Sequence, residues 1–334
     1  MKIIVPMAGK GKRMRPHTLT TPKPLIPIAG KSIVKRLVED IASMCEKPIE
    51  EVAFIIGEFG EAVENDLKKI AESIGTKATI HYQEEALGTG HAILCAGKSL
   101  TGNVIIAFAD TLFQADFKID PEEDGIVYTK KIENPQAFGV VVTDENNVIN
   151  RLEEKPEEFV SDKAIIGIYY FKDGDMLKDE LQYLIDNNIK DKGEFQLTNA
   201  MENMKDKGKK LKAANVNIWM DCGNKDVTVE TNREVLKLEK NKNLVSDQAK
   251  VENSAVLQPS FIGPDVQIKN SVIGPYASIG QNTVIENSIV SDSIIMDNAQ
   301  IRQGNIANSL LGNNVEFEGE PKDLSLGDFS RIKG

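Results

Sequence analysis

The sequence has few of the residues that build disulfide frameworks and metal sites. It contains three cysteines, Cys45, Cys95 and Cys222, an odd number at wide spacings. This spacing indicates neither a disulfide network nor a zinc knuckle, and it favours a reducing cytoplasm as the location. The three histidines all lie in the first third of the chain. Chemistry that relies on a histidine base is therefore disfavoured in the remaining two thirds.

Apolar runs long enough to cross a bilayer are also missing, and the run after Lys2 is too short for a secretory signal sequence. We therefore expect no membrane partner. The chain also lacks an excess of positive charge, because 51 acidic residues outnumber 40 lysines and arginines and give a net charge of −11. This balance disfavours a nucleic-acid partner. The length of 334 residues makes two domains the natural expectation.

Against this acidic background, residues 3–27 form a strongly basic stretch. An apolar run from Ile3 leads into a loop in which one lysine separates Gly9 from Gly11. This pattern predicts a buried strand followed by a turn whose backbone N–H groups approach phosphate oxygens closely. Lys23 follows on a segment stiffened by a proline on either side. The charged donors of the loop are Lys10, Lys12, Arg13 and Arg15.

Strands and helices alternate through the first 110 residues. Apolar runs predict strands at 51–57, 79–83 and 103–109, and helical spacing predicts helices at 31–47, at 61–74 and from Ala92. Such alternation predicts an α/β fold with a mainly parallel sheet covered on both faces. Ligands of such sheets bind at the carboxyl ends of the strands, and Asp110 stands at one of those ends.

The middle third is richer in strands, and the last third has a different texture. We expect strands at 125–131, 138–143, 148–152, 164–171 and 215–219, and helices at 176–188 and 226–242. From Val251 on, one aliphatic residue recurs every five or six positions. This hexapeptide period predicts a parallel β-helix of about three to four coils. Its repeating positions are Val256, Ile262, Ile268, Ile273, Ile279, Ile285, Val290, Ile295, Ile301, Ile306 and Leu311.

With these pieces in order, the chain resembles the sugar-phosphate nucleotidyltransferase family, also called nucleoside-diphosphate-sugar pyrophosphorylases. Residues 9–16 read GKGKRMRP and residues 22–25 read PKPL, close to the family pattern G-x-G-[ST]-R-x-x-P followed by P-K-P-L. The motifs E-K-P at 154–156 and W-x-D-x-G at 219–223 also match. The nearest members are glucose-1-phosphate thymidylyl- and uridylyltransferases that carry a C-terminal left-handed β-helix.

The resemblance implies a Rossmann-like catalytic domain over residues 1–230, a helical connector over 231–250, the β-helix over 251–320 and a tail over 321–334. It implies magnesium as the cofactor, bound by Asp110 and Asp221. It assigns catalysis to Arg13 and Lys23. The implied nucleotide-binding residues are Ala8, Gly9, Gly11, Lys12, Gln83, Gly88 and Thr89. The implied sugar-phosphate-binding residues are Gly139, Glu154, Lys155 and Glu194.

One residue departs from the family pattern. Lys12 stands where the family has a serine or threonine whose hydroxyl helps to hold the triphosphate. The binding of the phosphates is therefore expected to be rearranged around this lysine.

The implied reaction joins dTTP or UTP to a sugar 1-phosphate, most simply glucose 1-phosphate, and releases pyrophosphate. Mannose-1-phosphate guanylyltransferase and N-acetylhexosamine-1-phosphate uridylyltransferase remain alternatives, because they share the E-K-P motif and the β-helix. A catalytically silent, nucleotide-sugar-binding regulatory protein is an alternative of another class. The open end and flat faces of a β-helix invite pairing, so we also expect a homo-oligomer.

Overall fold

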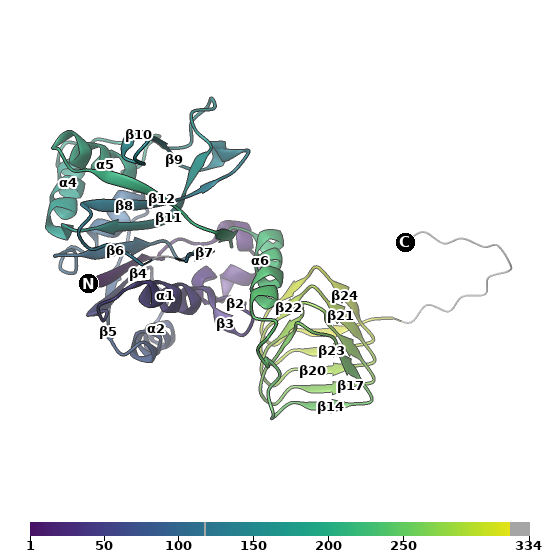
Figure 1. Cartoon of the computed structure of the whole chain (residues 1–334). Helices are drawn as coiled ribbons and strands as arrows, with labels where there is room; N and C mark the ends of the chain where they lie inside the picture. Colours follow the sequence, from purple (N-terminus) through teal and green to yellow (C-terminus); the bar gives the residue numbers. More distant parts are fainter. Residues whose placement is uncertain (117, 321–334) are drawn as a thin grey trace. The chain divides into compact units, whose positions relative to one another are not determined.

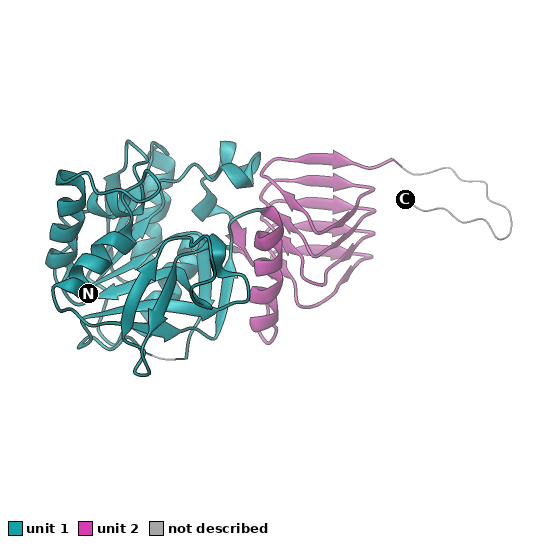
Figure 2. Cartoon of the chain, turned by 90° about the horizontal axis from the view of Figure 1, so that it is seen from above, with its two compact units in different colours: residues 1–26, 31–224 teal, residues 27–30, 225–334 magenta. Residues whose placement is uncertain are grey.

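The computed structural model of the chain describes residues 1–116 and 118–320 (Figure 1). These residues form two compact units, shown in different colours in Figure 2. The first unit holds residues 1–26 and 31–224, and the second holds residues 27–30 together with the chain from Lys225 on. The two units thus meet in sequence near residue 224, whereas the resemblance implied a boundary near 230. The implied tail at 321–334 lies outside the described residues.

A nine-stranded sheet organises the first unit. Its strands are β1 (Lys2–Pro6), β4 (Glu51–Ile56), β5 (Lys77–Tyr82), β6 (Val104–Ala107), β8 (Gly125–Lys131), β9 (Val140–Thr143), β10 (Ile149–Glu153), β11 (Lys163–Phe171) and β12 (Leu211–Asn215). The main order is β10-β9-β11-β6-β1-β4-β5, and β8 pairs with β11 and β12. β6, β1, β4 and β5 run parallel, whereas β11 runs antiparallel to its neighbours. The predicted Rossmann-like mixed sheet is confirmed.

Burial explains why the first strands are continuous apolar runs. Ile3, Ile4 and Val5 of β1 are fully buried, and every residue of β4 is buried. Both faces of these strands are covered by other parts of the unit, so neither face has to carry polar residues. Because β6, β1, β4 and β5 are parallel, the loops that follow them lie at one edge of the sheet.

Helices lie on both sides of this sheet in Figure 1. They are α1 (Ile33–Met44), α2 (Glu61–Ser73), α3 (Thr89–Leu94), α4 (Gly174–Asp186) and α5 (Leu197–Asp206). The side chain of Ser32 caps α1 by accepting a hydrogen bond from the backbone N–H of Lys35 at 3.4 Å. α3 begins at Thr89, three residues earlier than predicted. Gly88, at a φ of +119°, allows the loop to turn directly into the helix.

A small two-stranded sheet brings distant parts of the first unit together. β7 (Thr111–Gln114) pairs antiparallel with β13 (Ile218–Asp221), and Thr111 lies opposite Asp221 in the register. The backbone N–H of Cys222 donates to the carbonyl of Asp110 at 3.0 Å. This pairing sets the two aspartates side by side although more than a hundred residues separate them in sequence.

The second unit contains the predicted β-helix. Its ladders are β14-β17-β20-β23-β26, β15-β18-β21-β24 and β16-β19-β22-β25, all parallel. Successive rungs stack equivalent aliphatic side chains, as in the series Ile268, Ile285, Ile301. The strands are β14 (Lys250–Glu252), β15 (Ala255–Val256), β16 (Phe261–Ile262), β17 (Gln267–Lys269), β18 (Val272–Ile273), β19 (Ser278–Ile279), β20 (Val284–Glu286), β21 (Ile289–Ser291), β22 (Ile294–Ile295), β23 (Gln300–Arg302), β24 (Asn305–Ala307), β25 (Leu310–Leu311) and β26 (Glu316–Glu318). The fold is consistent with a left-handed β-helix.

A short segment from the start of the chain completes the second unit. Residues 27–30, which include β2 (Pro27–Ile28), join the β-helix and α6 (Lys225–Leu238). Asn232 on α6 is fully buried, and its Oδ1 accepts hydrogen bonds from the backbone N–H of Ala29 at 2.9 Å and from the hydroxyl of Ser278 at 2.7 Å. One carboxamide thus links three stretches of this unit that are far apart in sequence.

No helix among residues 1–116 and 118–320 combines the length and the apolar character that a bilayer crossing requires.

Candidate active site

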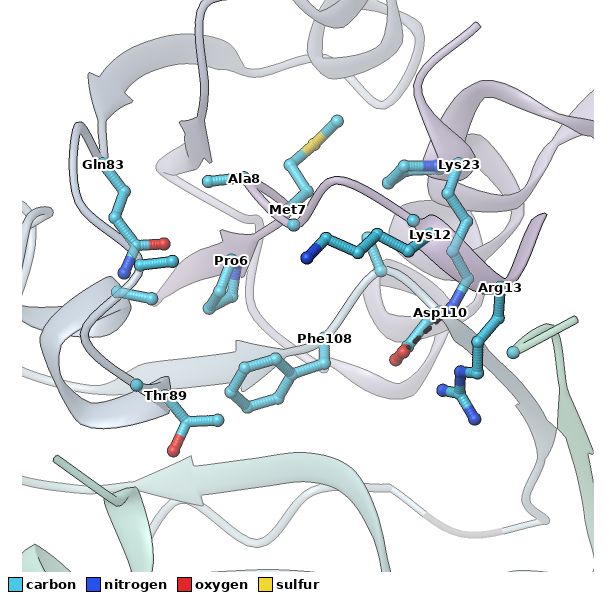
Figure 3. Close-up of a pocket in the computed structure, with 18 of the residues that line it drawn as sticks. Pro6, Met7, Ala8, Lys12, Arg13, Lys23, Gln83, Thr89, Phe108 and Asp110 are labelled. Atoms are coloured by element: carbon cyan, nitrogen blue, oxygen red, sulfur yellow. Dashed lines mark hydrogen bonds and ion pairs between the residues drawn. The ribbon is translucent and has the colours of Figure 1, made fainter. Parts of the chain in front are cut away.

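A cavity of about 420 Å³ lies in the first unit and is lined by the loops that follow β1, β5 and β6. Eleven of the residues implied by the family resemblance line it: Ala8, Gly9, Gly11, Lys12, Arg13, Lys23, Gln83, Gly88, Thr89, Asp110 and Glu194. In Figure 3 the charged residues Lys12, Arg13, Lys23 and Asp110 lie on one side of this cavity, and Gln83 and Thr89 lie on the other. The cavity therefore has a cationic end, at Arg13 and Lys23, and a Gln83 end, where Gly88 lies against Glu194.

The glycine-spaced loop is shaped by local contacts at Gly11. This residue has a φ of +55°, and a side chain there would meet Thr18 Cγ2 at 2.9 Å. The hydroxyl of Thr18 donates to the carbonyl of Gly11 at 2.8 Å and holds the turn. A side chain at Gly9 would instead meet open space within 4 Å. The backbone at Gly9 is therefore free to approach a ligand.

Lys23 and Asp110 form the best-defined ion pair of the cavity. The Lys23 Nζ lies 3.0 Å from Asp110 Oδ2, and this contact is drawn as a dashed line in Figure 3. Lys23 is only 8% exposed, whereas the Asp110 side chain is 49% exposed. The lysine is thus held rigidly with its ammonium group at the cavity, and the carboxylate remains open to solvent and to ligands.

The two aspartates are close enough to influence each other's charge. Burial and the neighbouring charge of Asp110 raise the pKa of Asp221, while Lys23 and Arg13 oppose this effect. A divalent cation between the two carboxylates would relieve their repulsion. Among the described residues no group of three or more carboxylate, histidine or cysteine side chains could hold a metal. Two carboxylates fit magnesium, which keeps waters and substrate phosphates as its other ligands.

The Gln83 end is built on a tightly packed loop. A side chain at Gly88 would meet the backbone oxygen of Phe195 at 2.5 Å, so only glycine fits there. The hydroxyl of Thr89 donates to Gln196 Oε1 at 2.9 Å and accepts from the backbone N–H of Leu197 at 3.0 Å. These bonds already use the Thr89 hydroxyl to fix the loop to the start of α5. The implied role of Thr89 in nucleotide binding stays a prediction.

The implied sugar-phosphate residues are only partly gathered at the cavity. Glu194 lines it, whereas Gly139, Glu154 and Lys155 lie outside its lining. These three are neighbours of one another: a side chain at Gly139 would meet Glu154 Oε2 at 3.0 Å, and Lys155 Nζ lies 3.5 Å from Glu154 Oε1. Lys155 has a φ of +46°, an uncommon conformation for lysine.

Sequence reasoning missed several apolar residues of the lining, of which Met7 and Phe108 have the largest side chains. Phe108 follows β6 and packs edge to face against Tyr169, with ring centroids 6.4 Å apart. It was interpreted as part of a buried strand. Its spacing of two residues from Asp110 could have indicated that it lines the same cavity, because alternate residues of an extended chain share a face.

The chain is similar in sequence to known proteins. Residues 2–237 match the sequence profile described as Nucleotidyl transferase. The bifunctional protein GlmU of Methanocaldococcus jannaschii is 31% identical over 342 aligned residues, covering 95% of this chain and 79% of the relative. The low-salt glycan biosynthesis nucleotidyltransferase Agl11 of Haloferax volcanii is 28% identical over 370, covering both chains fully. A glucose-1-phosphate thymidylyltransferase of Streptomyces griseus is 27% identical over 361, covering 100% of this chain and 99% of the relative.

Solved structures give the same fold. A UDP-glucose pyrophosphorylase complexed with UDP-glucose superposes with a TM-score of 0.57 at 22% identity, over 71% of this chain and 98% of that chain. At this identity the likeness concerns the fold alone. The sequence profile, however, spans most of the chain, and the motif residues of the glycine-spaced loop line one cavity with Asp110. This chain belongs to the nucleotidyl transferase family.

Proposed function

We propose that the chain joins dTTP or UTP to glucose 1-phosphate, forming a nucleoside-diphosphate sugar and releasing pyrophosphate. The observation that carries this proposal is the division of the cavity, with the amide of Gln83 at one end and the cations Arg13 and Lys23 at the other. The amide of Gln83 suits a base, and a cationic end suits a triphosphate. The acidic surface elsewhere leaves this cavity as a focused anion site.

The proposed reaction needs no general base, because the attacking oxygen of the sugar phosphate is already an anion. That oxygen forms a bond to the α-phosphorus, and the bond from this phosphorus to the bridging oxygen breaks as pyrophosphate leaves. The main tasks are to align two polyanions and to neutralise their charge. Arg13 would bind the α- and β-phosphates, and Lys23 would bridge the α-phosphate and the incoming phosphate. Magnesium on Asp110 and Asp221 would supply further charge screening.

The neighbouring trio of Gly139, Glu154 and Lys155 is proposed to serve the sugar phosphate. The Glu154 carboxylate would accept hydrogen bonds from sugar hydroxyls, and the Lys155 ammonium would pair with the phosphate. Glu194, in the lining of the cavity, would add a second acceptor for hydroxyls. The absence of a side chain at Gly139 leaves the carboxylate of Glu154 accessible, because any Cβ there would crowd Glu154 Oε2.

A substrate panel tests the proposal. UTP, dTTP, CTP and GTP would each be combined with glucose, mannose and N-acetylglucosamine 1-phosphates, and pyrophosphate release would be measured. Turnover limited to GTP with mannose 1-phosphate, or to UTP with the N-acetylhexosamine, would favour those alternatives. The second of these is the one that the GlmU relatives make worth testing. Binding of nucleotide-sugar without any turnover would indicate the silent regulatory protein.

Lys12 offers a test of the triphosphate assignment. Its side chain lies in the lining of the cavity, and its ammonium group points into the cavity in Figure 3. We expect Lys12→Thr to remain active and to raise the KM for the nucleoside triphosphate roughly fivefold, about 1 kcal/mol for an exposed charge. The KM for the sugar phosphate should change less. Lys10→Thr is the matched control, because Lys10 is exposed in the same loop and is not in the lining. A change confined to the sugar phosphate would refute the assignment.

The β-helix is proposed as a module for homo-oligomer assembly and not as an acetyltransferase site. The described part of this repeat contains no histidine, the residue that most often acts as general base in such transfers. We expect the full chain to release no thiol from acetyl-coenzyme A in the presence of an amino-sugar phosphate. Thiol release that depends on the acceptor would refute this, and light scattering would report whether the chain assembles.

A further inference from the structure

The side-chain amide of Gln83 contacts a second residue, His91, which does not line the cavity. Gln83 directly follows β5, and its Nε2 lies 3.1 Å from Nδ1 of His91 on α3. The charge and the backbone of Glu85, in the loop between them, raise the pKa of His91 and oppose the effect of its burial. His91 is therefore linked to the side chain of Gln83 and lies close to the loop that connects the two elements.

The surroundings of His91 indicate which ring nitrogen carries the proton. Burial lowers the pKa of His91, so the ring is neutral at neutral pH and has one N–H group. The backbone of Glu85 raises the pKa of the ring, which is the effect of a carbonyl that faces a ring N–H, and the proton is assigned to the nitrogen on that side. The nitrogen that faces Gln83 is then an acceptor, and only the NH₂ group of the amide can donate to it.

Fixing the NH₂ group also fixes the carbonyl oxygen of the same amide. In Figure 3 the oxygen of Gln83 points toward the interior of the cavity, and its nitrogen points away. A glutamine without such a partner could rotate its amide by half a turn and present a donor to a ligand instead. Here a half-turn would place the amide oxygen of Gln83 against the unprotonated nitrogen of His91, and the hydrogen bond between the two side chains would be lost.

The pyrimidine bases differ in what they offer such an oxygen. Uracil and thymine carry an N–H at ring position 3, whereas cytosine carries a bare nitrogen there and an amino group beside it. A fixed carbonyl accepts a hydrogen bond from uracil or thymine. Facing cytosine, the same carbonyl meets a second acceptor, and both groups are left without a partner.

We propose that His91 is a specificity-determining positioning residue, which locks the Gln83 amide so that the cavity accepts uracil or thymine nucleotides and rejects cytosine nucleotides. This inference rests on the proposed function, in which the Gln83 end of the cavity receives the base. His91 acts through Gln83 and does not line the cavity itself.

The test compares kcat/KM for UTP and CTP at saturating sugar phosphate, using the full-length chain. We expect His91→Leu, which has no acceptor, to lower the UTP-to-CTP ratio roughly tenfold or more. His91→Asn is the matched variant, because its amide oxygen can take the position of Nδ1. It should keep the ratio within about threefold of the original. Melting temperatures would verify that both variants are folded.

A double variant separates positioning from packing. If His91 acts through Gln83, adding His91→Leu to Gln83→Ala should not lower the ratio further. Equal losses with UTP and CTP in His91→Leu, or additive effects in the double variant, would overturn the proposal and leave the nucleotidyl transfer standing. A preference of the unmodified chain for purine nucleotides would overturn it together with the pyrimidine assignment. Complete inactivity of the unmodified chain would refute the proposed function as well.

Gln83→Glu gives a second route if His91→Leu does not fold. A carboxylate presents an oxygen to the base whichever way it turns, so it no longer depends on a locked orientation. We expect this variant to keep its rejection of CTP, even if its overall rate falls. A clear gain of CTP turnover relative to UTP in Gln83→Glu would overturn the proposal.

Discussion

An Asp221→Asn or Asp110→Asn variant is expected to lose about 10² to 10³ in kcat, on the scale of removing one preorganised charge from an active site. Each change halves the pair of carboxylates proposed to hold magnesium. The fold should survive, because the half-buried Asp221 and its neighbour repel each other and asparagine removes one of the charges. Steady-state assays over a range of magnesium concentrations would measure the loss, and melting curves would verify the fold.

The magnesium dependence supplies the decisive comparison for these variants. We expect added magnesium to raise the melting temperature of the unmodified chain and to have little effect on either variant, since a ligand stabilises only the form that binds it. Glu133→Gln is the matched control, because Glu133 is an exposed carboxylate of the same unit outside the cavity lining. Unchanged turnover of Asp110→Asn or Asp221→Asn at saturating magnesium would remove that residue from the mechanism.

Lys23→Met is expected to reduce kcat about 10² to 10³-fold with smaller changes in either KM. Methionine keeps the length and the apolar stem of the buried side chain and removes only the ammonium group. Because the partner Asp110 is half exposed, the lost ion pair should cost little stability. Rapid-mixing single-turnover measurements would show whether the chemical step itself is slowed.

Two further variants help to explain the expected loss of kcat in Lys23→Met. Lys23→Arg should not restore the rate, because a planar guanidinium does not fit where a compact ammonium group on a buried side chain lies against Asp110. Lys47→Met, at an exposed lysine of the same unit outside the cavity lining, should leave kcat unchanged. A Lys23→Met variant with normal kcat and only a raised KM would show that the lysine binds substrate without acting in the transfer.

Local patterns were sufficient to predict much of the fold and one edge of the cavity. The apolar run of β1 and the glycine spacing after it predicted a strand and a ligand-facing loop, and the hexapeptide period predicted the β-helix. Asp110 could be assigned to the sheet edge because it ends an apolar strand. These features depend on residues close in sequence, which is where periodicity is informative.

Contacts between segments that are distant in sequence could not be predicted from local patterns. The pairing of β7 with β13 brings Asp221 to Asp110, yet neither strand is distinctive in sequence. The hydroxyl of Thr89 is used by the start of α5, a partner more than a hundred residues away. The contact of His91 with Gln83 depends on how the intervening loop closes. Each of these contacts depends on the tertiary fold, and the sequence alone is compatible with many other pairings.

The buried carboxamide of Asn232 has a consequence for the order in which the newly made chain can fold. Ala29, one of its partners, leaves the ribosome about two hundred residues before Asn232, and Ser278 follows later still. Domains generally fold as units during synthesis, starting from the N-terminus. Residues 27–30 must therefore stay accessible while the first unit folds, and Ala29 gains its hydrogen bond to Asn232 only after α6 has been translated.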